Sequence, residues 1–351
     1  MKNKVLILLL SLLGVISCHR EETPASGSLR IVFETGAAET KAGDGDVADG
    51  GGIAINDGTP DLVVLIANTS TGSIAAAYPS GAAIVGELEG DPASTTVSVS
   101  FNGLIGSTSY TVYTFANTQG LWNMSDNLGS ISTASAVEAL QFTPIAADKE
   151  SDGSLVIKNS RLPLSAKGEV TLSSLGNGEI TLPLKRCVAK VTAVFENQYG
   201  EDLTLYDFTN TFYHMLPSTG YVIPHGNDFP VAKADAEDLT ASESSISIQN
   251  NQSYSMSWYV FPSIGPYSCD VSFYLNSHSD SEDPTYDPSE STNPIHEYSN
   301  LPVHDDHARD ITQLARNQHL TITTRIGKGK QVSFNFEVQD WGEKTESVTF
   351  N

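Results

Sequence analysis

The feature of this sequence that most constrains its fold is the spacing of its apolar residues, which come in short runs alternating with polar ones. Val97, Val99 and Phe101 alternate with serines, and residues 62–67 are a continuous apolar run of strand length. Alternate side chains of a strand point to opposite faces, so a period of two is typical of half-buried strands. β-Branched and aromatic residues dominate these runs, as pleated sheets favour. We therefore predict an all-β protein, either a sandwich or a barrel.

The second half of the chain has the same pattern, with strand-like runs at residues 188–195, 258–261, 271–275, 320–326 and 332–338. Signals for helices are few: residues 134–140, which follow Ser132 and Thr133 as candidate caps, and residues 307–315. A chain of 351 residues is long enough for two domains. The turn residues that precede the strand-like run at 188–195 predict a boundary near Pro183.

The first residues predict export from the cell. Lys2 and Lys4 precede an apolar run at residues 5–13, which is shorter than the roughly 20 residues that cross a bilayer. A charged start, a short apolar run and a small residue at the end describe a signal peptide. Cys18 directly follows Val-Ile-Ser, which resembles the lipobox of bacterial lipoproteins. Residues 1–17 are therefore predicted to be removed and Cys18 to be lipidated.

The charge of the chain excludes one class of partner. Without residues 1–17 the chain has 17 Lys and Arg residues (19 minus Lys2 and Lys4) against 42 Asp and Glu residues, a net charge of −25. Such a chain repels nucleic acid and anionic lipid.

Cys187 and Cys269 are the remaining cysteines, too few for a disulfide framework. They either pair in an oxidising compartment or are buried free thiols.

We find no motif that predicts catalysis, and no catalytic residue or cofactor is expected. His304, Asp305, Asp306 and His307 have the side chains of a metal site, but their spacing matches no common motif. The Asp-rich residues 44–49 lack the closing Glu of a calcium loop. A solvated loop and a linker explain both better, so no metal is expected. The three tryptophans are either stacking platforms for sugars or, more simply, core residues.

Short amphipathic strands at the two ends of the chain suggest how it assembles. Leu29, Ile31 and Phe33 share one face near the N-terminus, and Val348 and Phe350 alternate at the C-terminus. A terminal strand that leaves its own sheet can add to the open edge of another molecule's sheet. The alternative is that both strands close their own sandwiches.

The order of several motifs along the chain resembles the fimbrillin family of Bacteroidales, the subunits of lipoprotein-derived type V pili. The resemblance covers nearly the whole chain. It is carried by Cys18, residues 29–33, Lys41-Ala42, residues 162–165, residues 184–191, Ala315-Arg316-Asn317 and residues 338–341.

This resemblance implies two transthyretin-like β-sandwich domains in tandem. Residues 1–17 would be the signal peptide, 18–41 a lipidated propeptide with a detachable strand, 42–183 the N-terminal sandwich and 184–351 the C-terminal sandwich with a terminal donor segment. It also implies that Leu29, Ile31 and Phe33 are in a strand that leaves after proteolysis, and that a neighbouring subunit fills the groove. Val348 and Phe350 would belong to the donor strand.

The family implies maturation at Lys41-Ala42, with one departure: well-known members have Arg where this chain has Lys41. Either a protease accepts Lys41, or the subunit keeps its lipid and acts as an anchor.

We therefore expect a non-enzymatic structural and adhesive subunit of a cell-surface fimbria. Its expected partners are other fimbrial subunits of the same or a homologous kind, the outer membrane through the lipid of the precursor, and a receptor on a host or bacterial surface. The alternative is a monomeric surface lipoprotein that binds glycans through exposed aromatic residues.

Overall fold

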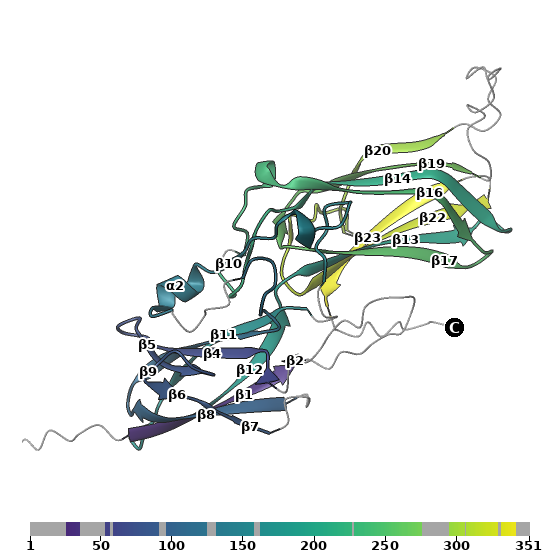
Figure 1. The fold of residues 1–351 in the computed structure, drawn as a ribbon. Helices are drawn as coiled ribbons and strands as arrows, with labels where there is room; N and C mark the ends of the chain where they lie inside the picture. The colour runs from purple at the N-terminus through teal and green to yellow at the C-terminus, as the bar shows by residue number, and fades with distance from the viewer. Residues whose placement is uncertain are drawn as a thin grey trace, which may run out of the picture.

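The computed structural model describes residues 26–35, 53–56, 59–90, 96–124, 131–157, 162–226, 228–275, 295–305, 307–328 and 331–341. Over these residues the protein consists of two β-sandwiches in tandem (Figure 1). The prediction of an all-β fold built from sandwiches is confirmed. No described helix is long and apolar enough to cross a membrane.

A single sheet of nine strands builds the first sandwich. Within it, β11 (Leu164–Thr171) pairs with β12 (Asn177–Arg186) at two positions only, Leu164 with Arg186 and Ser165 with Lys185. The strands on the two sides of this narrow connection pack around one apolar core. In spatial order the strands are β6 (Ile84–Val85), β5 (Ile74–Tyr78), β4 (Leu62–Asn68), β9 (Ser109–Ala116), β11 (Leu164–Thr171), β12 (Asn177–Arg186), β1 (Ser26–Thr35), β8 (Thr96–Ile105) and β7 (Glu87–Glu89). A small separate pair is formed by β2 (Ile55–Asn56) and β3 (Thr59–Pro60).

Two sheets of four strands form the second sandwich and enclose a core of their own. One sheet has the order β17 (Ser253–Val260), β13 (Ala189–Gln198), β22 (Gln318–Gly327) and β23 (Val332–Asp340). The other has the order β16 (Glu237–Ile248), β14 (Leu203–Leu216), β19 (Ser268–Leu275) and β20 (His296–Pro302).

A third apolar cluster joins the two halves of the chain. The Trp122 ring meets Phe142 and Phe261 edge-on, with ring centroids 5.3 and 5.4 Å away. Phe142 is in β10 (Gln141–Phe142), which pairs with β15 (Gly220–Tyr221) from the second half of the chain. A nearby pair is β18 (Ser263–Ile264) and β21 (Gln313–Leu314). The two sandwiches therefore share buried aromatic contacts.

One helix prediction is confirmed and one is wrong. Helix α2 (Ala134–Glu138) begins after Thr133, whose hydroxyl accepts a hydrogen bond from the Ala136 amide. Residues 307–315 form no helix where they are described. The Asp305 carboxylate accepts the backbone amides of His307 and Arg309, and Ala308 has a φ of 58°, so the chain turns there.

The domain boundary predicted between residues 183 and 184 falls inside β12, which continues to Arg186. β13 of the second sandwich begins at Ala189.

Candidate functional site

The N-terminal strand β1 lies inside the first sandwich rather than at its edge (Figure 1). It pairs antiparallel with β8 along one side and parallel with β12 along the other. We call this position between β8 and β12 the β1 lane. Both walls of the lane come from later parts of the chain, so β1 completes a sheet whose other strands lie within residues 62–186.

The inner face of β1 is apolar and fully buried. The side chains of Leu29, Ile31 and Phe33 are each 0% exposed and belong to the core of the first sandwich. Each is the register partner of one residue of β8 and one of β12. These partners are Phe101 and Gly178 for Leu29, Val99 and Ile180 for Ile31, and Val97 and Leu182 for Phe33. Burial of side chains of this size stabilises a fold by about 1.5–3 kcal/mol each. Without β1, the lane would be a hydrophobic trough.

Two glycines allow the start of β1 to approach the opposite backbone closely. A Cβ added to Gly27 would lie 2.1 Å from the carbonyl oxygen of Gly176. Gly176 itself has a φ of +87°, a conformation that side chains rarely adopt. The β1 lane is therefore closed at this end by backbone packed against backbone.

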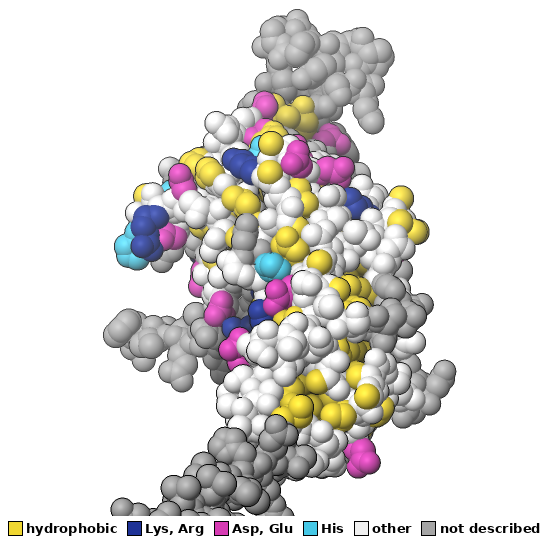
Figure 2. All heavy atoms as spheres, turned by 90° about the vertical axis from the view of Figure 1, so that its left-hand side faces the viewer, with side chains coloured by type: hydrophobic (Ala, Val, Ile, Leu, Met, Phe, Trp, Pro, Cys, Tyr) yellow, Lys and Arg dark blue, Asp and Glu magenta, His cyan; other side chains and the backbone are white. Residues whose placement is uncertain are grey.

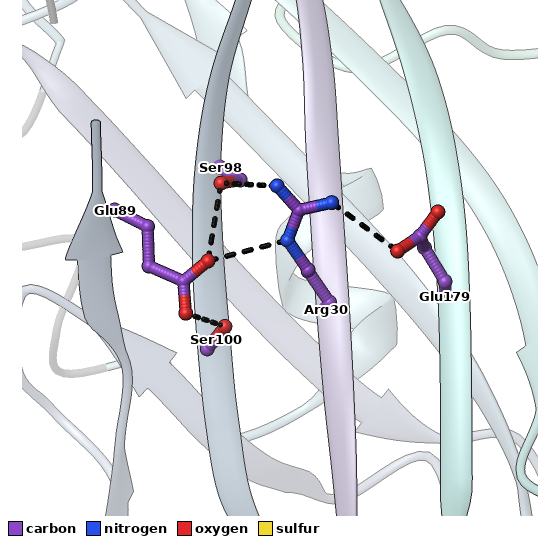
Figure 3. A network of polar contacts seen from close by, with 5 residues as sticks. All are labelled: Arg30, Glu89, Ser98, Ser100 and Glu179. Atoms are coloured by element: carbon purple, nitrogen blue, oxygen red, sulfur yellow. Dashed lines mark hydrogen bonds and ion pairs between the residues drawn. The ribbon is translucent and has the colours of Figure 1, made fainter. Parts of the chain in front are cut away.

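The outer face of β1 has one cation, Arg30, which bonds to three strands (Figure 3). Its Nε donates to the Glu89 carboxylate of β7 at 3.2 Å, and one terminal nitrogen donates to Glu179 of β12 at 3.2 Å. The other terminal nitrogen donates to the Ser98 hydroxyl of β8 at 3.1 Å. Glu89 reaches Arg30 over β8 because the side chains there, Ser98 and Ser100, are small.

The charges of this network stabilise one another. The hydroxyl of Ser100 and the Arg30 guanidinium hold the pKa of Glu89 below its usual value, and Glu89 and Glu179 raise the pKa of Arg30. All three charged side chains are about half exposed, so water and salt weaken each pair. Each pair therefore contributes little to the stability of the fold.

A buried arginine ties the two sandwiches together behind β12. Arg316 donates to the Ser165 hydroxyl at 2.6 Å and to the carbonyl oxygen of Val222 at 3.4 Å. It also contacts the Cys187 sulfur at 3.2 Å. Burial raises the pKa of the Cys187 thiol. Cys187 and Cys269 are both buried and free, which decides between the two expectations for them.

Trp341, the last described residue, is fixed at the same junction. Its ring lies 4.3 Å from the Arg186 guanidinium, and its backbone amide donates to Asn317. Trp122, Trp258 and Trp341 are 0, 6 and 8% exposed. They are core residues in this structure and offer no open stacking platform.

Several predicted sites lie outside the described residues, namely Cys18, Lys41, Ala42, Val348 and Phe350. The described residues contain no group of three metal-ligating side chains. In the segment that contains His304 and His307, the Asp305 carboxylate accepts a hydrogen bond from Arg309. The Asp-rich residues 44–49 also lie outside the described part.

The outer network was missed by sequence reasoning. Its central residue is Arg30, whose two carboxylate partners are 59 and 149 residues away in the sequence. The available signal was a lone Arg in the middle of an amphipathic strand. Figure 2 shows another face of the molecule, on which charged side chains are scattered among uncharged ones.

The chain is similar to known proteins in its sequence family and in its structure. The family model described as fimbrillin-A associated anchor proteins Mfa1 and Mfa2 matches residues 104–347. No curated protein sequence matches the chain. A candidate cell adhesion protein of Bacteroides eggerthii has a similar structure, with 12% identity and a TM-score of 0.51 over 91% of this chain and 97% of that chain. The fimbrial anchor protein Mfa2 of Porphyromonas gingivalis matches at 8% identity and a TM-score of 0.35, over 91% and 98% of the two chains.

Proposed function

Because the chain belongs to the family of fimbrillin-A associated anchor proteins Mfa1 and Mfa2, we propose that it is a structural and adhesive subunit of a cell-surface fimbria. It would join other fimbrial subunits by strand exchange, in which β1 leaves its lane and a strand of a neighbouring subunit takes its place.

The position of β1 carries this proposal. A strand that lies between two others and buries Leu29, Ile31 and Phe33 completely would leave hydrogen-bonding backbone and an apolar trough behind it. Both are what an added strand needs, since main-chain hydrogen bonds supply affinity and alternate side chains supply register. β1 is also the first described strand, so a single cut after it would free it from the rest of the chain.

The two steps before exchange are proposed from the sequence. Cys18 would receive the lipid that holds the precursor on the outer membrane, and cleavage at Lys41-Ala42 would separate β1 from the first sandwich. The donor strand would lie in residues 342–351, with Val348 and Phe350 as its inward-facing side chains. The fixed position of Trp341 supports a donor segment that begins just after it.

Truncation tests the donor role. Removal of residues 342–351 leaves Trp341 and the junction intact, so we expect a folded protein that forms no SDS-resistant ladders. Replacement of Val348 and Phe350 with Ala should act in the same way, whereas Ser347→Ala with Thr349→Ala, on the other face, should leave the ladders unchanged. Full ladders from the truncated chain would overturn the donor role.

Cleavage is tested by Lys41→Gln. We expect mild trypsin treatment to cut the unaltered chain at Lys41 first and to promote ladders, and the variant to remain monomeric. A chain that stays monomeric after the cut, and is retarded in native gels that contain polysaccharide, would favour a glycan-binding lipoprotein instead.

A further inference from the structure

The two faces of β1 impose different demands on any strand that replaces it. The inner face requires apolar side chains at alternate positions, which many strands can provide. On the outer face, the Arg30 guanidinium uses all three of its nitrogens, each on a different strand. Its two carboxylate partners, Glu89 of β7 and Glu179 of β12, are not part of β1 and would stay when β1 leaves (Figure 3).

The empty lane would therefore be acidic on its outer side. Glu87 and Glu89 of β7 lie along one wall and Glu179 along the other. β8 contributes no charged residue, and the first cation on β12 is Lys185, six residues beyond Glu179. An uncharged strand would leave these carboxylates with no cation between them, and an acidic strand would add repulsion.

We propose that the β1 lane selects a donor strand with Lys or Arg on its outer face, at the position that Arg30 occupies, flanked on the inner face by large apolar side chains. The proposal rests on the strand-exchange function above and names the chemistry of the partner. It follows from charge complementarity between the incoming strand and two strands that remain in place.

The chain's own C-terminal segment does not meet this requirement. If Val348 and Phe350 face inward, side chains alternate along the strand, and the outward residues are Glu343, Thr345, Ser347, Thr349 and Asn351, none of them basic. Lys344 falls on the inward set. The lane should thus prefer the strand of a different, outward-basic subunit to that of a second copy of this chain.

Peptide exchange tests the selection. The full chain without its signal peptide is cut after Lys41, or at a specific protease site placed in residues 37–42, and fluorescent peptides then compete with the noncovalently held β1. We expect a peptide of residues 26–35 to bind about three- to tenfold more tightly than its Arg30→Gln version, with a preference that shrinks at high salt. Arg30→Glu should bind more weakly still, and Val32→Gln serves as an uncharged control on the same outer face.

Two further comparisons make the test reciprocal. A chain with Glu89→Lys and Glu179→Lys should prefer the Arg30→Glu peptide. A peptide of residues 342–351 should gain affinity by about three- to tenfold with Ser347→Arg or Thr349→Arg. Equal binding of the Arg30 and Arg30→Gln peptides at low salt would overturn this inference and leave strand exchange standing. Binding of no peptide would overturn both.

Discussion

At the scale of single residues, the inner face of β1 contributes to stability and its outer face to selectivity. Leu29, Ile31 and Phe33 are completely buried, so each contributes to stability through the apolar area that it removes from water. Arg30 is about half exposed and contributes through the geometry of its three contacts. Removal of an inward side chain should therefore change stability, and removal of Arg30 should change selectivity.

Phe33→Ala is the direct test of the inner face. We expect the variant to lose about 3–5 kcal/mol of unfolding free energy of the first sandwich, because a cavity forms where the ring was. Val32→Ala, on the outer face of the same strand, should cost less than about 1 kcal/mol. Denaturant unfolding followed by fluorescence measures both. Equal, small losses would mean that β1 contributes little to the core.

Single residues also show how far sequence reasoning reaches. The apolar face of β1 was predictable because its pattern lies within five consecutive residues, 29–33. The role of Arg30 was not, since it depends on strands that pair only after residues 59 and 149 positions away are brought together. Short-range alternation is visible in a sequence, but a contact across three strands requires the topology.

At the scale of elements, strands were predictable where alternation is unbroken, as in β8 and β23. β14 was missed because it bulges where it pairs with β19: the three steps from Tyr206 to Thr209 lie opposite only two steps of β19, and Asp207 within them has a φ of 48°. Such a bulge shifts the apolar face from odd to even positions and hides the period of two. β12 was missed because its Gly and Pro residues indicate a turn in the sequence.

The retention of β1 in its lane should weaken at low pH. The pKa of Glu89 is depressed in the fold, so the stability it contributes is present above its unfolded value of 4.5 and is lost as the pH falls through the folded pKa. We expect hydrogen-exchange protection of the β1 amides, corrected for intrinsic rates, to decline below pH 4.5 more steeply in the unaltered chain than in Glu89→Gln. Glu87→Gln, on the same strand, is the control. An identical decline in Glu89→Gln would show that this network does not hold β1.

At the scale of the whole molecule, the shared aromatic cluster should contribute to the stability of both sandwiches. Trp122 and Phe142 come from the first half of the chain and Phe261 from the second, and all three are at most 1% exposed. Arg316 adds a buried polar connection to Ser165 across the same junction. A substitution in this cluster should therefore change the stability of both sandwiches.

Phe261→Ala tests this coupling. We expect a loss of about 3–5 kcal/mol and lower unfolding temperatures for both sandwiches, as measured by calorimetry. Phe273→Ala is the matched control, because Phe273 is fully buried in the core of the second sandwich alone. If Phe261→Ala lowers only one transition, the junction does not couple the two sandwiches.

The order of strands in the first sandwich has a consequence for the state without β1. Among the described strands, β8 pairs only with β1 and β7, so β1 is what makes the nine strands one continuous sheet. Its departure would leave six strands that end at β12 and a separate pair, β7 and β8, attached by side-chain packing, by the chain at Gly86 and by the turn after Ile105, where the Ser107 amide donates to the Ser173 carbonyl oxygen. The opening would then lie between two sheets that share no backbone pairing. An arriving strand would restore one continuous sheet only by pairing with both β12 and β8.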